Sequence, residues 1–160
     1  MPNYKQHLLG GCAAYGLAML AASSTCTLSC VTASEWLACT LAGSLFPDID
    51  IKSKGQKLFY SLFLVTTFVL VITNELQTAA LLSILGCVPL LVRHRGIFHD
   101  LWFIIALSSI STALLSRYIV SSCPVNVWLH TLFFNAGAFS HLVLDKGLKK
   151  TLVVPEYFQL

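Results

Sequence analysis

The sequence predicts an all-α protein, a polytopic membrane helix bundle with five or six transmembrane helices. Hydrophobic residues make up 56% of the 160 residues and charged residues only 11%, and the mean hydropathy is +0.77. A soluble domain usually carries about 25% charged residues, so the composition indicates an integral membrane protein. A chain of this length forms one domain, and we assign residues 1–160 to it.

Apolar runs separated by short polar junctions define the expected helices. The first run, Leu8 to Ala33, is rich in small residues that let a neighbouring helix approach closely. It is too long for the apolar core of a signal peptide. The next stretch, Glu35 to Phe46, is short for a full crossing, so it tilts, re-enters, or continues a helix begun earlier. Pro47 disfavours helical geometry at the preceding residue and is expected to end this stretch.

Four further spans complete the expected bundle. They are Leu58 to Thr73, Leu76 to Val92, Ile97 to Val120 and Asn126 to Leu144. Asn74 and Glu75, between the first two of these spans, are typical of a turn. Pro89 is expected to kink or shorten the end of its helix.

The charges are distributed unevenly between the two faces of such a bundle. With six crossings, nine of the ten Lys and Arg residues fall on the side of the N-terminus, which the positive-inside rule makes cytoplasmic. The same arrangement places all four Asp and four of the five His on that face. Orientation requires only the cations, so the gathering of His and Asp there needs another explanation.

The segment Arg93 to Asp100, Arg-His-Arg-Gly-Ile-Phe-His-Asp, concentrates this polarity between two apolar runs. A continuous helix would point His94 and His99 about 140° apart, but Gly96 loosens the backbone and a bend would turn both rings toward one point. Imidazole is a common metal ligand and Arg binds phosphate well, which favours a metal site with an anion clamp. The alternative is a basic loop that sets orientation, with His99 and Asp100 capping the next helix.

Two other short motifs offer ligands. His141 and Asp145 are four residues apart and stack on one helix face, where they can bind one metal ion or form a hydrogen bond at a helix end. Pro-Asp-Ile-Asp at 47–50 holds two carboxylates, Asp48 and Asp50, on a rigid bend. One of them could bind a metal while the other orients a histidine or accepts a proton. The alternative for both is capping of the following helix.

The two remaining histidines carry less information individually. His7 lies at the start of the first run, where a lone histidine is more often interfacial than a ligand. His130 lies within the last span toward the opposite face, so we interpret it as a hydrogen-bonded interior residue outside the site. Taken together, four His and four Asp near the ends of at least four helices favour a metal site, because ionisable groups near a bundle interior are usually functional.

With these residues in view, the chain resembles the YdjM-like family of predicted membrane-bound metal-dependent hydrolases. The resemblance rests on His7, Leu-Phe-Pro-Asp-Ile-Asp at 45–50, His-Arg-Gly-x-x-His at 94–99 and His-Leu-Val-Leu-Asp at 141–145. That family is distantly similar to zinc-dependent phospholipase C and P1 nuclease, helical enzymes that hydrolyse phosphoesters at His and Asp metal clusters. The resemblance implies that the metal ligands are His7, Asp48 or Asp50, His94 or His99, His141 and Asp145.

This sequence departs from the family pattern in two ways. Phe98 and Asp100 flank His99 where small hydroxyl residues are expected. The chain also has too few His and Asp residues to hold three ions, so we expect one or two.

The leading functional hypothesis is a metal-dependent phosphoester hydrolase at the cytoplasmic face of a bacterial inner membrane, with both termini on that side. The mixed nitrogen and oxygen ligands suit Zn²⁺, with Mn²⁺ as the rival. Asp48 or Asp50 would bridge metals or accept the proton of a water molecule. Arg95, with Arg93 or Lys52, would hold the phosphate. A site where lipid meets water favours a lipid-linked phosphate, and no nucleic-acid partner is expected.

Other classes of function make different demands on the sequence. A metal or proton transporter would place its ligands near the bilayer midplane, whereas these residues gather at one edge. A haem protein needs two histidines at mid-depth, and only His130 lies there. A metal-stabilised scaffold without catalytic activity needs the same ligands as the hydrolase.

Overall fold

Helices form all the regular secondary structure in the described part of the chain. The computed structural model describes residues 3–22, 29–50, 52–91, 97–119 and 124–153. In chain order the elements are α1 (Tyr4–Ala22), α2 (Cys30–Leu45), the 3-10 turn η1 (Phe46–Asp50), α3 (Lys54–Ile72), α4 (Leu76–Leu91), the 3-10 turn η2 (Ile97–His99), α5 (Leu101–Ile119), α6 (Pro124–Lys146) and α7 (Leu148–Leu152). The prediction of an all-α fold is confirmed.

Side-chain caps define where three of the helices begin. The Ser29 hydroxyl accepts a hydrogen bond from the Thr32 amide at the start of α2. At the start of α3, the Ser53 hydroxyl accepts one from the Gln56 amide. The Asp100 carboxylate accepts from the Trp102 amide at 3.0 Å and caps α5. Each cap satisfies an amide that has no partner within its helix. Capping by Asp100 is one of the two roles that the sequence allowed for this segment.

The prediction that Leu8 to Ala33 forms one run of helix is wrong. Helix α1 ends at Ala22, and α2 begins at Cys30 with Ser29 as its cap. Serine hydroxyls compete for backbone hydrogen bonds and favour caps over helix interiors, and Ser29 takes this role with an extended backbone at the start of α2. The short stretch Glu35 to Phe46 therefore continues a helix that starts at Cys30.

The later boundaries follow the sequence signals more closely. Helix α2 ends at Leu45, immediately before the turn that contains Pro47. Asn74 has a φ of 65°, a left-handed conformation that asparagine tolerates well, and it closes the predicted turn between α3 and α4. Pro89 lies inside α4, which ends at Leu91.

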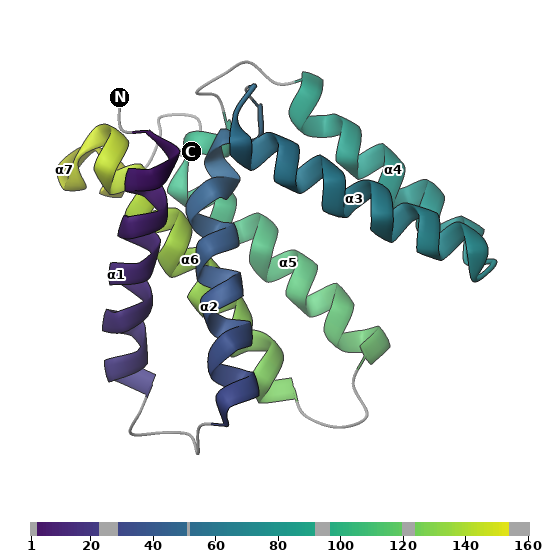
Figure 1. The fold of residues 1–160 in the computed structure, drawn as a ribbon, viewed down its shortest axis with the longest axis horizontal. Coiled ribbons are helices and arrows are strands. Elements are labelled where there is room, and N and C mark those ends of the chain that lie inside the picture. The colour runs from purple at the N-terminus through teal and green to yellow at the C-terminus, as the bar shows by residue number, and fades with distance from the viewer. Residues whose placement is uncertain (1–2, 23–28, 51, 92–96, 120–123, 154–160) are drawn as a thin grey trace.

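Helices α1, α2 and α6 lie side by side, and α5 packs against α6 (Figure 1). The α3–α4 hairpin contacts η1 and projects away from this group (Figure 1). One buried cluster is built around Trp36 and Phe133, whose rings stack with centroids 4.7 Å apart. The second combines buried Leu101 and Ile104 of α5 with Ala138 and Leu142 of α6.

The closest helix contact is between α2 and α6, and it depends on two glycines. A Cβ atom added to Gly43 would overlap the carbonyl oxygen of Phe134, and one added to Gly137 would overlap that of Thr40. Small residues at such positions let two backbones approach more closely than side chains would otherwise allow. This contact brings the last turn of α2 against the C-terminal half of α6.

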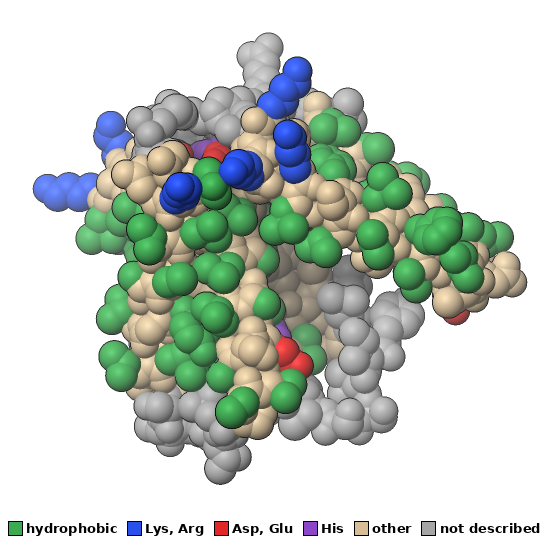
Figure 2. Space-filling view, in the orientation of Figure 1, with side chains coloured by type: hydrophobic (Ala, Val, Ile, Leu, Met, Phe, Trp, Pro, Cys, Tyr) green, Lys and Arg blue, Asp and Glu red, His purple; other side chains and the backbone are tan. Residues whose placement is uncertain are grey.

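Two described helices are long and apolar enough to cross a membrane, α3 and the part of α6 from Val127 to Lys146. Large apolar side chains on α1 and α3 are exposed, among them Leu17 at 71%, Leu64 at 68% and Phe68 at 62%. Figure 2 shows these apolar surfaces, and it shows Lys side chains gathered at the end where α1 and α3 begin. This distribution fits insertion into a bilayer.

Replacing Gly137 by alanine tests the α2–α6 contact. The added methyl group has no space at the Thr40 carbonyl, so the helices must separate, and G137A should lose about 1–3 kcal/mol of stability. Thermal unfolding in detergent, followed by circular dichroism, measures the effect as a lower Tm.

Gly16 offers the matched control, because a Cβ atom there meets no described atom within 4 Å. Alanine is a better helix former than glycine by about 0.5–1 kcal/mol, so G16A should leave the Tm unchanged or raise it. Equal losses in both variants would contradict the close contact.

Candidate metal centre

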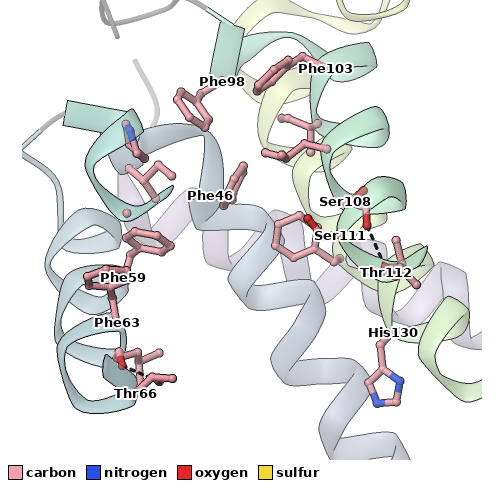
Figure 3. A pocket seen from close by; sticks show the side chains of 18 of the residues that line it. Phe46, Phe59, Phe63, Thr66, Phe98, Phe103, Ser108, Ser111, Thr112 and His130 are labelled. Carbon is pink, nitrogen blue, oxygen red and sulfur yellow. Dashed lines mark hydrogen bonds between the residues drawn. The ribbon is translucent and has the colours of Figure 1, made fainter. Parts of the chain in front are cut away.

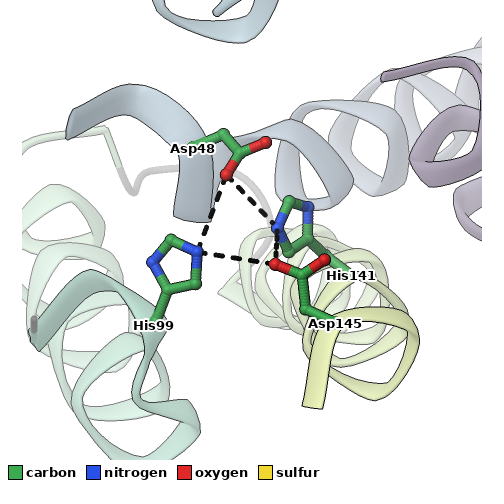
Figure 4. Close-up of side chains that lie close together, drawn as sticks. All are labelled: Asp48, His99, His141 and Asp145. Carbon is green, nitrogen blue, oxygen red and sulfur yellow. Dashed lines mark ion pairs between the residues drawn. The ribbon is translucent and has the colours of Figure 1, made fainter. Parts of the chain in front are cut away.

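Four side chains from three elements converge at one point in the structure. Asp48 comes from η1, His99 from η2, and His141 and Asp145 from adjacent turns of α6 (Figure 4). One ligand atom from each residue lies within 4.8 Å of all the others. Residues separated by almost a hundred positions in the chain therefore form a single candidate metal-binding cluster.

The distances within this cluster suit a four-coordinate cation. Asp48 Oδ1 lies 3.6 Å from both His99 Nε2 and His141 Nε2. Asp145 Oδ2 lies 3.8 Å from His99 Nε2 and 3.6 Å from His141 Nε2. Ligands bound to Zn²⁺ at about 2.1 Å in tetrahedral geometry are about 3.4 Å apart. All four ligand atoms lie within 4.8 Å of one another, so they would have to draw together to bind one cation at these bond lengths.

The hydrogen bond made by His141 identifies the nitrogen that is available to a metal. Its Nδ1 lies 2.7 Å from the Ser44 carbonyl oxygen of α2, a partner that can only accept, so Nδ1 carries the proton. The lone pair of the neutral ring is then on Nε2, which faces the two carboxylates. This Nε2 atom is buried and has no hydrogen-bond partner among the described residues. Such an atom in a native fold calls for an explanation, and a bound cation supplies one.

His7 of α1 lies directly against the cluster. Its ring stacks on that of His141 with centroids 3.7 Å apart, and its Nε2 lies 3.6 Å from Asp145 Oδ1. Asp145 therefore turns one oxygen toward His7 and the other toward His99 and His141. This geometry suits a residue that orients the Asp145 ligand.

Asp48 differs from the other three members because it reaches solvent. Its side chain is 20% exposed, compared with 6% for Asp145 and 0% for His99 and His141. Burial opposes ionisation of Asp48, but the nearby His99, His141 and His7 rings outweigh it and hold the pKa of Asp48 below its usual range. Asp48 is thus a carboxylate at neutral pH, and it lies at the accessible side of the cluster.

The other predicted site residues either lie outside the described part of the chain or lie apart from the cluster. Asp50 ends η1, but its side chain is not among those described. Arg93, His94 and Arg95 lie outside the described residues, so their assigned roles remain predictions. His130 is separate from the cluster, as expected, and pairs with Glu35 at 3.2 Å.

Two contacts at the site were absent from the sequence analysis. The Ser44 carbonyl orients His141, and Lys146 donates a hydrogen bond to the His99 carbonyl, which ties η2 to α6. Pro47 was a partial signal for the first contact, because proline cannot donate a hydrogen bond to the last turn of α2 and leaves a carbonyl there available. No sequence signal indicated the second.

The fold and the site together define a class, the helical membrane proteins with a candidate His and Asp metal centre. Within this class, the chain belongs to the YdjM inner membrane protein family, whose model matches residues 1–149. The match confirms the resemblance to the YdjM family, and the family description places its members in the inner membrane. The hydrolase activity and the similarity to phospholipase C and P1 nuclease stay predictions. No curated protein and no solved structure matches the chain.

Removing His99 should abolish high-affinity metal binding, because His99 Nε2 faces both carboxylates of the cluster. H99A is expected to weaken binding by more than about 100-fold while the helices remain folded. Elemental analysis of the purified protein gives the metal content, and far-ultraviolet circular dichroism gives the helix content.

H130A is the matched control, since His130 is also partly buried and paired with a carboxylate but lies outside the cluster. It should keep the metal content of the unmodified protein. Normal metal content in H99A would reject the assignment.

Metal affinity should also fall as the pH is lowered from 7.5 to 5.5, by about 10- to 100-fold. A histidine binds metal only when the binding nitrogen is unprotonated, so protons compete with the cation. The lowered pKa of Asp48 means that this carboxylate stays ionised through the range and does not contribute to the loss. Titration with Zn²⁺ by calorimetry at several pH values measures the slope, and a pH-independent affinity would argue against histidine ligands.

Proposed function

We propose that this protein is a metal-dependent hydrolase of phosphoesters that acts at the cytoplasmic face of the inner membrane. The observation that carries the proposal is the cluster itself, three buried ligands together with one carboxylate that is open to solvent. A catalytic metal site needs protein ligands on one side and access on the other. Asp48 is the most exposed member of the cluster, so solvent and substrate would reach the cation on its side.

Zn²⁺ is the preferred cation for this site, with Mn²⁺ as the rival. His99, His141 and Asp145 form a mixed nitrogen and oxygen set that both ions accept, and three protein ligands with a fourth position left for water are typical of catalytic zinc sites. A second ion would require further ligands, and the roles predicted for His7, Asp50 and His94 would then apply.

Each residue has a distinct role in the proposed mechanism. His99, His141 and Asp145 would hold the cation, and the Ser44 carbonyl and His7 keep two of these ligands in place. When bound, the cation would supply Lewis acidity, which lowers the pKa of water and polarises a phosphoryl oxygen. Asp48 is ionised and exposed, so it would accept the proton of the attacking water once that water has been made more acidic.

Positive charge near the centre would position the substrate. All seven lysines lie near the ends of elements that meet at this end of the molecule, and Figure 2 shows several of them there. They are Lys5, Lys52, Lys54, Lys57, Lys146, Lys149 and Lys150. Arg95, with Arg93 or Lys52, would bind the phosphate, Arg in bidentate fashion. The same charges support a cytoplasmic site and cytoplasmic termini, and termini on one side require an even number of crossings, which is six of the predicted five or six.

A metal-stabilised scaffold is the second candidate, and one observation favours it. Four protein ligands complete a tetrahedral shell, which is typical of structural zinc sites. The two proposals differ in the role of Asp48, which is a proton acceptor in the hydrolase and a fourth ligand in the scaffold. A transporter is less favoured, because the cluster lies at the lysine-rich end and not midway along the helices.

Replacing Asp48 by asparagine separates these two functions. In the hydrolase, D48N should keep its metal and its Tm but lose about 10²- to 10⁴-fold in rate, because only the proton acceptor is removed. The measurements are metal content, thermal unfolding, and hydrolysis of a panel that includes nitrophenyl phosphate mono- and diesters and phosphatidic acid.

D145N is the comparison, because Asp145 is buried between three histidines and should be required for metal binding in either case. It should lose metal and activity together. Loss of metal and a lower Tm in D48N, with no hydrolysis of any ester by the unmodified protein, would favour the scaffold.

A further inference from the structure

A large apolar cavity lies beside the candidate metal centre, between the α3–α4 hairpin and helices α5 and α6. We propose that it binds the hydrocarbon chain of a phosphate-bearing lipid whose head group reaches the centre. This inference rests on the proposed hydrolase function and specifies its substrate class.

The size and lining of the cavity fit a hydrocarbon chain. Its volume is about 640 Å³, within the range of about 300 to 1,000 Å³ that is usual for small-molecule sites. Aromatic rings dominate the wall (Figure 3). They are Phe46, Phe59, Phe63, Phe98, Phe103 and Phe134.

Four of the five hydroxyl groups among the described lining residues already have partners. The Ser108 hydroxyl donates to Asn135 Oδ1 at 3.0 Å, that of Thr112 bonds to Thr131, and that of Thr66 donates to the Leu62 carbonyl at 2.9 Å. A polar ligand would have to break these bonds to gain contacts with the same groups. An apolar chain leaves them intact and removes aromatic surface from water.

The cavity and the metal centre share the two 3-10 turns. Ile49 and Phe98 line the cavity, and each is the chain neighbour of a centre residue, Asp48 and His99 respectively. Phe46 and Phe98 meet edge to face with ring centroids 5.8 Å apart. A ligand whose phosphate is at the centre would therefore extend its tail past these turns into the cavity.

The cavity is elongated along α5, and one side of it is continuous with the outer surface. Lining residues extend from Phe103 to Thr112, nine steps along the helix or about 13 Å. Figure 3 shows Phe98 and Phe103 near one end and His130 near the other. Leu62 lines the cavity and is also 60% exposed on α3, so a chain could enter from the bilayer between the helices.

The location of charge selects a lipid over an uncharged hydrocarbon or a peptide. The lysines lie at the end of the molecule that holds the centre, whereas none of the described lining residues of the cavity is Lys, Arg, Asp or Glu. A molecule with an anionic head and a linear apolar tail matches both parts at once. A peptide segment would bring backbone amides into a wall whose hydroxyls, except that of Ser111, are already bonded.

A photoaffinity probe tests this assignment directly. The full chain, with Zn²⁺ bound and in phosphatidylcholine nanodiscs, is mixed with dodecyl phosphate that carries a diazirine at the far end of the chain. After illumination, mass spectrometry identifies the labelled residues. We expect label on the cavity faces of α3 and α5, and excess dodecyl phosphate should compete for it whereas inorganic phosphate should not.

Two tryptophan variants on consecutive positions of α5 provide the matched comparison. Ser111 lines the cavity, so S111W should fill it and reduce cavity labelling by about tenfold. Ile110 is 60% exposed and does not line the cavity, so I110W should label like the unmodified protein. Equal labelling of both variants, or label spread over outward-facing residues such as Val65 in proportion to exposure, would overturn the proposal.

The readout also separates this inference from the proposed function. Cavity labelling without hydrolysis of any ester would reject the hydrolase and leave the lipid site standing. Hydrolysis of soluble nitrophenyl phosphate at equal rates in S111W and I110W, without cavity labelling in the unmodified protein, would reject the lipid site alone.

Discussion

The contact between α2 and α6 at Gly43 and Gly137 is the constraint on which the candidate site depends. Because neither residue has a side chain, the two backbones come close enough for the Ser44 carbonyl to accept a hydrogen bond from His141. That bond selects the tautomer and turns Nε2 toward the carboxylates. A wider separation would leave the ring free to rotate and would remove η1, and with it Asp48, from the cluster.

The two 3-10 turns, η1 and η2, contribute residues both to the candidate metal centre and to the wall of the apolar cavity. On one side they hold Asp48 and His99 beside the ligands of α6, and on the other side they present Ile49 and Phe98 to the apolar cavity. A polar centre and a hydrocarbon-lined space thus adjoin each other at these turns. A lipid with a charged head is the kind of molecule that has both requirements, which is why the proposed chemistry and the proposed tail site support each other.

The sequence predicted some features well because they depend on local physics. Asn74 tolerates a left-handed turn, Pro47 ends a helix, and Asp100 caps one, and each acts through its nearest neighbours in the chain. The prediction of one helix from Leu8 to Ala33 was wrong because hydropathy alone cannot locate a break between two apolar helices. The cap at Ser29 decides where α2 begins, and one serine among many in that run gave no distinctive signal.

Composition and motif order by themselves determined the helical membrane class, the family, and a set of His and Asp residues suited to a metal. The i, i+4 spacing of His141 and Asp145 determined that these two face one another. Only the tertiary structure decided that Asp48 and His99 join them, since η1 and η2 meet α6 through contacts between residues distant in the chain. It also decided that His7 stacks on His141 and that an apolar cavity adjoins the centre, because both arise from how the helices pack and not from any local pattern.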